Sequence, residues 1–149
     1  MASQRERIRM TDDEAAEFLA TERTVQVASI GPDGTPHLVP MWFAVIDGRI
    51  AFWTYAKSQK ALNLLRDPRV TCLVEAGDTY GELRGLSITG RAEIADDYET
   101  VFEVGSAVSV RYMGDITHAS KAGIEAQARK RLAVFVNVEK TASWDHRKL

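Results

Sequence analysis

The pattern of hydrophobic and polar positions along the chain predicts six β-strands, separated by turns and helices. Clear turn signals bound the early strands: Gly31-Pro32-Asp33-Gly34 follows the first, and Asp47-Gly48 follows the second. Gly85 and Gly90 lie inside the fifth strand and indicate β-bulges. The predicted strands span residues 24–30, 36–46, 49–54, 69–75, 82–94 and 131–138.

Capping residues and the helical spacing of apolar residues predict four helices between or before these strands. Thr11 and Glu14 form a capping box that opens the first helix. Ser58 is a favourable N-cap for the second helix, and Asp67-Pro68 ends it. The predicted helices span about residues 11–22, 58–66, 96–113 and 121–130.

Strands in mostly hairpin order, with helices between them, indicate a mainly β fold with helices in the α+β class. We expect about six antiparallel strands to form a closed or half-closed barrel; an open α+β sandwich is the alternative. A length of 149 residues fits one domain, so residues 1–149 are expected to form a single unit.

Composition and charge exclude several classes of function. The net charge of −2 provides no attraction to nucleic acid or to an anionic membrane. Cys72 is the one cysteine and is predicted to be buried and inert, and the three histidines show no metal-ligand spacing. No apolar run approaches the ~20 residues of a membrane span, and the charged N-terminus lacks a signal-peptide core. A cytoplasmic protein without a metal is therefore expected.

The segment from Phe52 to Leu64 has the features of an anion-binding site. After the predicted strand ends at Thr54, a short loop carries Lys57. A helix then begins with Ser58 as its N-cap and Lys60 in its first turn. The first N–H groups of a helix have no internal partner, and the helix dipole adds roughly half a positive charge. With two lysines and a hydroxyl added, this helix start is suited to a phosphate.

The alternative interpretation of this segment is a capped surface helix with two solvated lysines, because caps are common and lysines are usually exposed. Elsewhere, the basic run Arg129-Lys130-Arg131 is expected to be solvated surface.

The same segment resembles the cofactor segment of the pyridoxamine 5′-phosphate oxidase family. In that family an aromatic-threonine pair ends a barrel strand, and Ser-X-Lys follows to bind the flavin phosphate. Here these motifs are Trp53-Thr54 and Ser58-Gln59-Lys60. Gly34-Thr35-Pro36, Arg66-Asp67-Pro68-Arg69 and Gly90-Arg91-Ala92-Glu93 also have counterparts. The resemblance implies an FMN-binding-like split β-barrel.

Two features favour one branch of that family. The oxidase itself has a phosphate-binding arginine on its second strand, where this chain has about Val39. The stretch from Ser58 to Asn63 is similar to the flavin/deazaflavin oxidoreductase group. This resemblance implies the deazaflavin coenzyme factor 420, with FMN as the alternative, and hydride transfer to a small conjugated organic substrate. An FMN-dependent oxidase or reductase and a non-catalytic flavin or deazaflavin binding protein are the alternative functions.

The resemblance also implies where the cofactor lies. The family fold is a homodimer with its cofactors at the subunit interface. The phosphate would be held by Lys57, Ser58 and Lys60, the ring would lie along the second strand, and Thr54 would reach the ribityl chain or ring. No catalytic residue is assigned, and the proton donor stays open among Tyr55, Tyr80, Tyr112 and His118. The predicted cofactor-binding residues are Val39, Pro40, Met41, Trp42, Trp53, Thr54, Lys57, Ser58, Gln59, Lys60 and Asn63.

Overall fold

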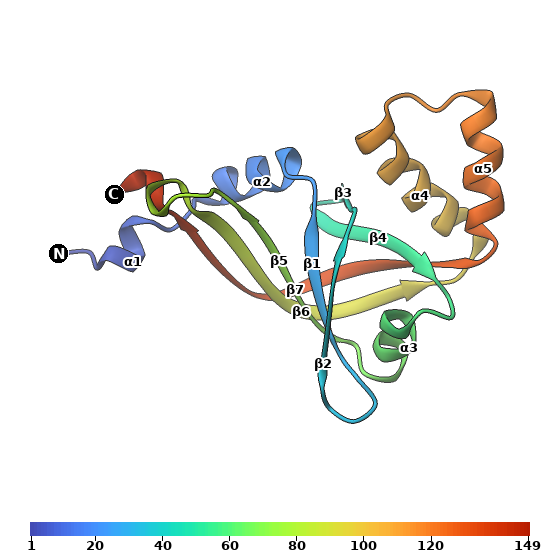
Figure 1. Ribbon diagram of the computed structural model, residues 1–149, viewed down its shortest axis with the longest axis horizontal. Helices are drawn as coiled ribbons and strands as arrows, with labels where there is room; N and C mark the ends of the chain where they lie inside the picture. The colour runs from blue at the N-terminus through green and yellow to red at the C-terminus, as the bar shows by residue number, and fades with distance from the viewer.

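The computed structural model describes all 149 residues and contains one antiparallel sheet of seven strands in the order β2-β1-β5-β6-β7-β4-β3. The sheet curls into a half-barrel with helices at its two ends (Figure 1). The predicted α+β split barrel is confirmed. The strands are β1 (Val25–Ile30), β2 (Pro36–Met41), β3 (Ala44–Ile46), β4 (Arg49–Tyr55), β5 (Arg69–Ala76), β6 (Arg84–Ala95) and β7 (Arg131–Asp145).

The strand predicted at residues 36–46 is in fact two strands. Trp42 and Phe43 belong to neither strand, and β2 pairs with β1 whereas β3 pairs with β4. Phe43 is fully buried, and its backbone N–H donates to the Tyr112 hydroxyl at 3.2 Å. Since β2 and β3 are the opposite edges of the sheet, this two-residue link brings the edges together and curls the sheet into a barrel.

The last strand is longer than predicted. It continues through Asp145 and pairs with β6 from Arg84↔Asp145 to Ala95↔Ala133. Residues 137–141 are exposed, so hydrophobic patterning alone does not mark them as strand. A shift of register confirms the bulge predicted at Gly90, whereas Gly85 pairs regularly with Trp144 and marks a close packing contact instead.

The helices are α1 (Gln4–Arg7), α2 (Asp12–Thr21), α3 (Gln59–Arg66), α4 (Tyr98–Met113) and α5 (His118–Ala128), with short 3-10 turns at Tyr80–Glu82 and His146–Lys148. The capping box of Thr11 and the N-cap of Ser58 form as predicted. Helix α1 was not predicted, and α5 begins at His118, earlier than expected, because Thr117 and Ser120 make their own capping box. No helix combines the length and apolar character needed to cross a membrane.

Two groups of buried side chains stabilise the fold. The main core fills the barrel and contains the fully buried Phe43 and Phe52. A smaller group joins α4 to the outer side of β4 and β7 through residues such as Val104 and Phe135. Because of this second group, the α4–α5 pair is fixed beside the end of β4 (Figure 1).

Cys72 is predicted to be unreactive in the native protein. The side chain is fully buried, and burial raises the pKa of its thiol to about 12, so almost no thiolate exists near neutral pH. We expect the thiol reagent 5,5′-dithiobis(2-nitrobenzoic acid) to label no cysteine in the folded protein. In guanidinium chloride it should label one cysteine per chain. Rapid labelling of the folded chain would contradict this assignment.

Candidate functional site

The site is built where β4 ends and α3 begins. Ser58 caps α3, and its hydroxyl accepts the Ala61 N–H at 3.3 Å. Thr54 is buried at the end of β4, with its hydroxyl oxygen 3.1 Å from that of Ser58. The Lys60 ammonium folds back over this pair and donates to Thr54 Oγ1 at 3.0 Å. Three of the predicted cofactor-binding residues, Thr54, Ser58 and Lys60, therefore lie together.

A second cation, Arg131, lies beside Lys60. It is the first residue of β7 and pairs directly with Tyr55 in the β4–β7 register. Its guanidinium lies over the rings of Trp53 and Tyr55, at 4.8 Å and 4.2 Å from the ring centroids. The expectation that this arginine is solvated surface is wrong. Only the strand register, which no local pattern reveals, brings it to this position.

The two cations are close but have no anionic partner. Burial lowers the pKa of Lys60, and the positive charge of Arg131 lowers it further. Neither residue forms an ion pair with a carboxylate. The Arg131 Nε is buried and has no hydrogen-bond partner. A bound anion would relieve the repulsion and supply the missing acceptor, so the residues present fit the phosphate of a flavin-type cofactor.

The remaining residues predicted on α3 have different environments. Lys57 is exposed and makes no hydrogen bond or ion pair. Gln59 is exposed, and its amide donates to the side chain of Asn63 at 2.8 Å. Asn63 is fully buried and donates to the Ser29 hydroxyl at 3.1 Å. With its amide engaged in this way, Asn63 anchors α3 to β1 and lies away from any surface that a ligand could contact.

A pocket of about 450 Å³ adjoins Arg131. Trp53 and Arg131 form its wall on the sheet, and Met41 and Trp42 lie at its edge. Val39 and Pro40, predicted to lie along the ring, do not line it, because they lie farther along the β1–β2 hairpin. Trp42 is half exposed and stacks on Tyr112, with the ring centroids 4.5 Å apart and the planes 3° from parallel.

The other side of this pocket comes from α4 and α5, which the sequence analysis did not include in the site. The contributing residues are Gly105, Val108, Ser109, Met113, Ser120, Gly123, Ile124 and Gln127. In the sequence, small and apolar residues at helical spacing look the same as an ordinary buried helix face, so no local signal marks them as pocket residues. Arg131 is the one charged side chain in the lining. The structure contains no group of three or more His, Cys, Asp or Glu residues arranged to hold a metal ion.

Gly105 is predicted to set the width of the pocket. A Cβ added there would lie 2.3 Å from Trp53 Cζ3, so a side chain must displace the indole. Overpacking costs about 1–3 kcal/mol, only partly offset by the better helix propensity of alanine. We expect Gly105→Ala to destabilise the protein by about 1 kcal/mol in a denaturant titration and to shift its tryptophan fluorescence.

Gly123 offers a matched control, since it lines the same pocket from α5 and nothing lies within 4 Å of an added Cβ. Gly123→Ala should stabilise the protein by about 0.5–1 kcal/mol. Equal changes in the free energy of unfolding for Gly105→Ala and Gly123→Ala would show that close packing of Gly105 on the Trp53 indole does not affect stability.

The seven-stranded sheet, curled into a half-barrel with helices around it, defines this chain as a split-barrel protein. The chain belongs to the pyridoxamine 5′-phosphate oxidase family, whose model matches residues 11–145. The family predicted from the sequence is thereby confirmed.

Solved structures agree with this membership. The crystal structure of the conserved hypothetical protein Rv2991 from Mycobacterium tuberculosis is 50% identical, has a TM-score of 0.92, and aligns over 99% of this chain and 92% of that chain. A structure described as an F420 reductase is 27% identical, with a TM-score of 0.68, over 85% of this chain and 94% of that chain. The heme storage protein HutZ from Vibrio cholerae is 17% identical, with a TM-score of 0.70, over 90% and 93%, and shares the fold. No curated protein matches the chain.

Proposed function

We propose that this protein binds the deazaflavin coenzyme factor 420 and transfers hydride from its reduced form to a small conjugated organic substrate. The observation that carries the proposal is the pair of cations, Lys60 and Arg131, which lie together without an anion beside a pocket of about 450 Å³. The similarity to an F420 reductase and the motif from Ser58 to Asn63 favour the deazaflavin.

Each residue of the cluster has a separate task in this proposal. Lys60 and Arg131 neutralise the cofactor phosphate, and the hydroxyls of Thr54 and Ser58 orient the lysine through the contacts described above. The free N–H groups at the start of α3 add further donors. Lys57 and Gln59 are exposed at the same helix start, where they can reach the outer side of a phosphate.

The adjoining pocket would hold the ring and the substrate. When bound, the reduced cofactor supplies the hydride, so the protein needs no nucleophile of its own. Trp53, Met41 and the helices α4 and α5 provide apolar walls that exclude water and hold a flat molecule in place. Arg131, the one charged side chain in the lining, joins this pocket to the phosphate cluster.

A second candidate is a non-catalytic flavin or deazaflavin binding protein. It is favoured by the lining of the pocket, which contains no His, Asp, Glu or Tyr to act as a proton donor. An FMN-dependent oxidase or reductase uses the same phosphate cluster and is separated from the deazaflavin enzyme by cofactor affinity alone.

Fluorescence titration of the purified protein with oxidised factor 420 and with FMN tests the cofactor. We expect saturable binding of both, with the deazaflavin bound at least about tenfold more tightly. Tighter binding of FMN would transfer the proposal to the FMN-dependent alternative, and failure to bind either would refute it. Oxidation of the reduced deazaflavin by a quinone such as menadione, at a rate above the protein-free control, would exclude the non-catalytic candidate.

We further propose that the protein works as a homodimer, with the cofactor site completed at the interface. Strand β7 pairs with β4 only as far as Phe135, and the stretch 137–141 pairs with β6 alone. These residues are exposed on both faces, and Val138 is 51% exposed. Leu38 on the edge strand β2 is 64% exposed. Large apolar side chains at such positions are typical of surfaces that a partner covers.

Sedimentation velocity tests this assembly. The unsubstituted chain should sediment as a dimer, and Val138→Glu should shift it toward monomer and weaken cofactor binding in parallel. Val110→Glu is the control, because Val110 is similarly exposed on α4 but lies outside the proposed interface. A monomer that binds the cofactor with full affinity would contradict the proposal.

A further inference from the structure

An aromatic stack lies at the edge of the pocket beside Arg131. The Trp42 indole and the Tyr112 ring have their centroids 4.5 Å apart, with planes only 3° from parallel. The guanidinium of Arg23 lies over the Tyr112 ring, 5.4 Å from its centroid. Trp42 lines the pocket and is 49% exposed. Because Tyr112 covers one face of the indole, the exposed half of Trp42 belongs to its other face and its edges.

Hydrogen bonds fix the position of the Tyr112 ring. Its hydroxyl donates to the Arg23 carbonyl and accepts the Phe43 N–H at 3.2 Å. The tyrosine proton is therefore already used within the chain, and Tyr112 contributes to the pocket through its ring. Phe43, the neighbour of Trp42 in the chain, is fully buried and anchors the backbone of the link. The indole is thus held in place before any ligand arrives.

The pocket beside this stack offers hydrogen-bond donors but no carboxylate. Its polar lining includes Ser109 on α4, Gln127 on α5 and Arg131 on β7. Hydroxyl, amide and guanidinium groups can all donate to an oxygen atom of a ligand. No Asp or Glu lines the pocket, so a cationic ligand would find no partner there and would be repelled by Arg131. The lining therefore favours a ligand that carries oxygen acceptors and no positive charge.

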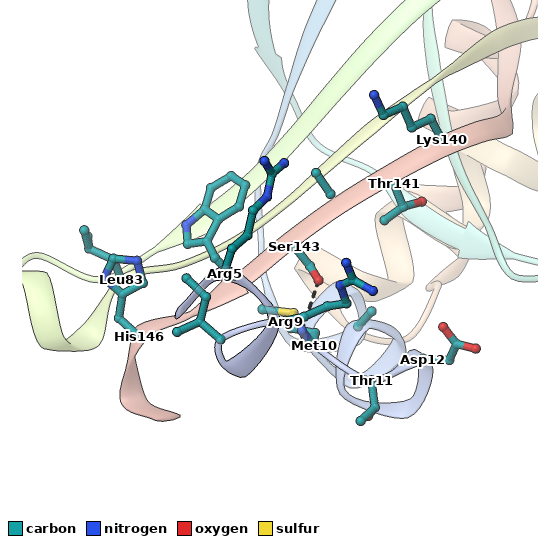
Figure 2. A pocket seen from close by; sticks show the side chains of 14 residues that line it. Arg5, Arg9, Met10, Thr11, Asp12, Leu83, Lys140, Thr141, Ser143 and His146 are labelled. Carbon is teal, nitrogen blue, oxygen red and sulfur yellow. Dashed lines mark hydrogen bonds between the residues drawn. The ribbon is translucent and has the colours of Figure 1, made fainter. Parts of the chain in front are cut away.

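A larger hollow, of about 740 Å³, lies at the end of the sheet where the two termini meet (Figures 1 and 2). Trp144 contributes an indole to it. Lys140 and Thr141, labelled in Figure 2, also line it, and both belong to the exposed stretch 137–141 of the proposed homodimer interface. The pocket beside Arg131 contains none of these residues, so its ligand can be considered separately from the assembly.

We propose that Trp42 selects the substrate of the pocket beside Arg131 by stacking on the flat ring of an aromatic carbonyl compound that carries no positive charge. The carbonyl oxygen accepts from the donors of the lining, and Tyr112 is a positioning residue that holds the indole. Aromatic stacking stabilises a flat ring beyond its buried area, which a saturated ring of the same size cannot gain. The inference rests on the proposed function, because it names the class of substrate for the same pocket.

Isothermal titration calorimetry of the full, cofactor-free chain with three probes tests the role of Trp42. The probes are chromone, a flat aromatic ketone; trans-1-decalone, a saturated ketone of similar size; and 4-aminoquinoline, a flat cation at neutral pH. We expect chromone to bind one per chain, at least about fivefold more tightly than the other two. Trp42→Leu should weaken chromone binding at least about fivefold and leave decalone binding unchanged.

Two conservative variants separate stacking from a merely structural effect. Trp42→Phe keeps an aromatic ring and should retain most of the preference for chromone over decalone. Tyr112→Phe keeps the ring of the stack but loses both hydrogen bonds of the hydroxyl, so it should give a preference between those of Trp42→Leu and the unsubstituted chain. A preference lost equally in all three variants would contradict the proposal.

Matched controls place the ligand in this pocket. Tyr98→Leu removes an exposed aromatic side chain on α4 outside the lining, and Trp144→Leu removes the indole of the larger hollow. Both should leave chromone affinity unchanged. The proposal is overturned if chromone does not bind, if decalone or the cation binds as tightly, or if Trp144→Leu removes binding while Trp42→Leu does not. Since this titration contains no cofactor, failure of factor 420 to bind would refute the proposed redox function without changing these affinities.

Discussion

Replacing Lys60 by methionine is expected to weaken cofactor binding by roughly tenfold to a hundredfold while making the cofactor-free protein slightly more stable. The loss of affinity follows from removing a charge-assisted contact, worth about 1.5–3 kcal/mol. The gain in stability follows because the half-buried ammonium is desolvated and repelled by Arg131. We expect only a small gain, since solvent screens part of the lysine charge and methionine keeps most of the aliphatic packing.

Opposite effects on binding and stability distinguish a functional lysine from a structural one. Thermal unfolding without cofactor and fluorescence titration with cofactor measure the two quantities separately. Lys121→Met is the matched control: this lysine is exposed on α5, its ammonium is 4.0 Å from Glu125, and both measurements should stay close to those of the unsubstituted chain. A Lys60→Met protein that is markedly less stable and binds the cofactor normally would assign the lysine to the fold alone.

The pH dependence of stability provides an independent check. The folded-state pKa of Lys60 lies below its unfolded value, so at alkaline pH the unfolded chain holds more protons. The charged lysine therefore costs stability at neutral pH, and that cost disappears as pH rises through its lowered pKa toward 10.5. The stability advantage of Lys60→Met should shrink between pH 7 and pH ~10. An advantage that grows over this range would contradict the assignment.

Asn63→Ala is expected to destabilise the protein by about 2 kcal/mol, which corresponds to a fall in Tm of about 4–8 °C. The asparagine is fully buried, and its side chain hydrogen-bonds those of Ser29, Gln59 and Arg66. Alanine removes these contacts and leaves the buried Ser29 hydroxyl without its partner. Cofactor affinity should fall only to the extent that the start of α3 moves.

A double-mutant cycle with Ser29→Ala isolates the contact between β1 and α3. If the hydrogen bond carries the effect, the double variant should lose clearly less than the sum of the two single losses. Additive losses would show that the two side chains act independently. Thermal unfolding of the variants in saturating cofactor should show a smaller loss of Tm, because binding stabilises the native state.

The sequence predicted those parts of the fold and site that depend on neighbouring residues. Ser58 as the N-cap and Lys60 in the first turn of the helix are local features, and both take the predicted places. Arg131 was missed because only the pairing of β4 with β7 puts it beside Lys60. Asn63 was interpreted as a cofactor contact because its motif resembles the family pattern, whereas the packing of α3 on β1 buries it.

The strand boundaries also depend on contacts between residues that are distant in the sequence, and so they were predicted less well. The apolar residues around Trp42 and Phe43 continue the β2 pattern, so no local signal marks the point where the chain moves from one sheet edge to the other. At the polar end of β7 the prediction stopped too early. The exposed residues there show no alternation of apolar and polar positions, and yet they pair along β6. The helix pair α4–α5 was predicted as helices, but its position beside Trp53 depends on tertiary packing.

The link at Trp42 and Phe43 contributes both to the barrel core and to the pocket beside Arg131. Phe43 lies in the barrel interior, and the adjacent Trp42 faces the pocket beside Arg131. Filling that pocket should therefore slow hydrogen exchange at the Phe43 amide, although that amide is shielded from any ligand by its bond to Tyr112. Pocket occupancy and barrel closure should therefore be coupled, so binding should lower the fraction of molecules in which the barrel has opened at this link.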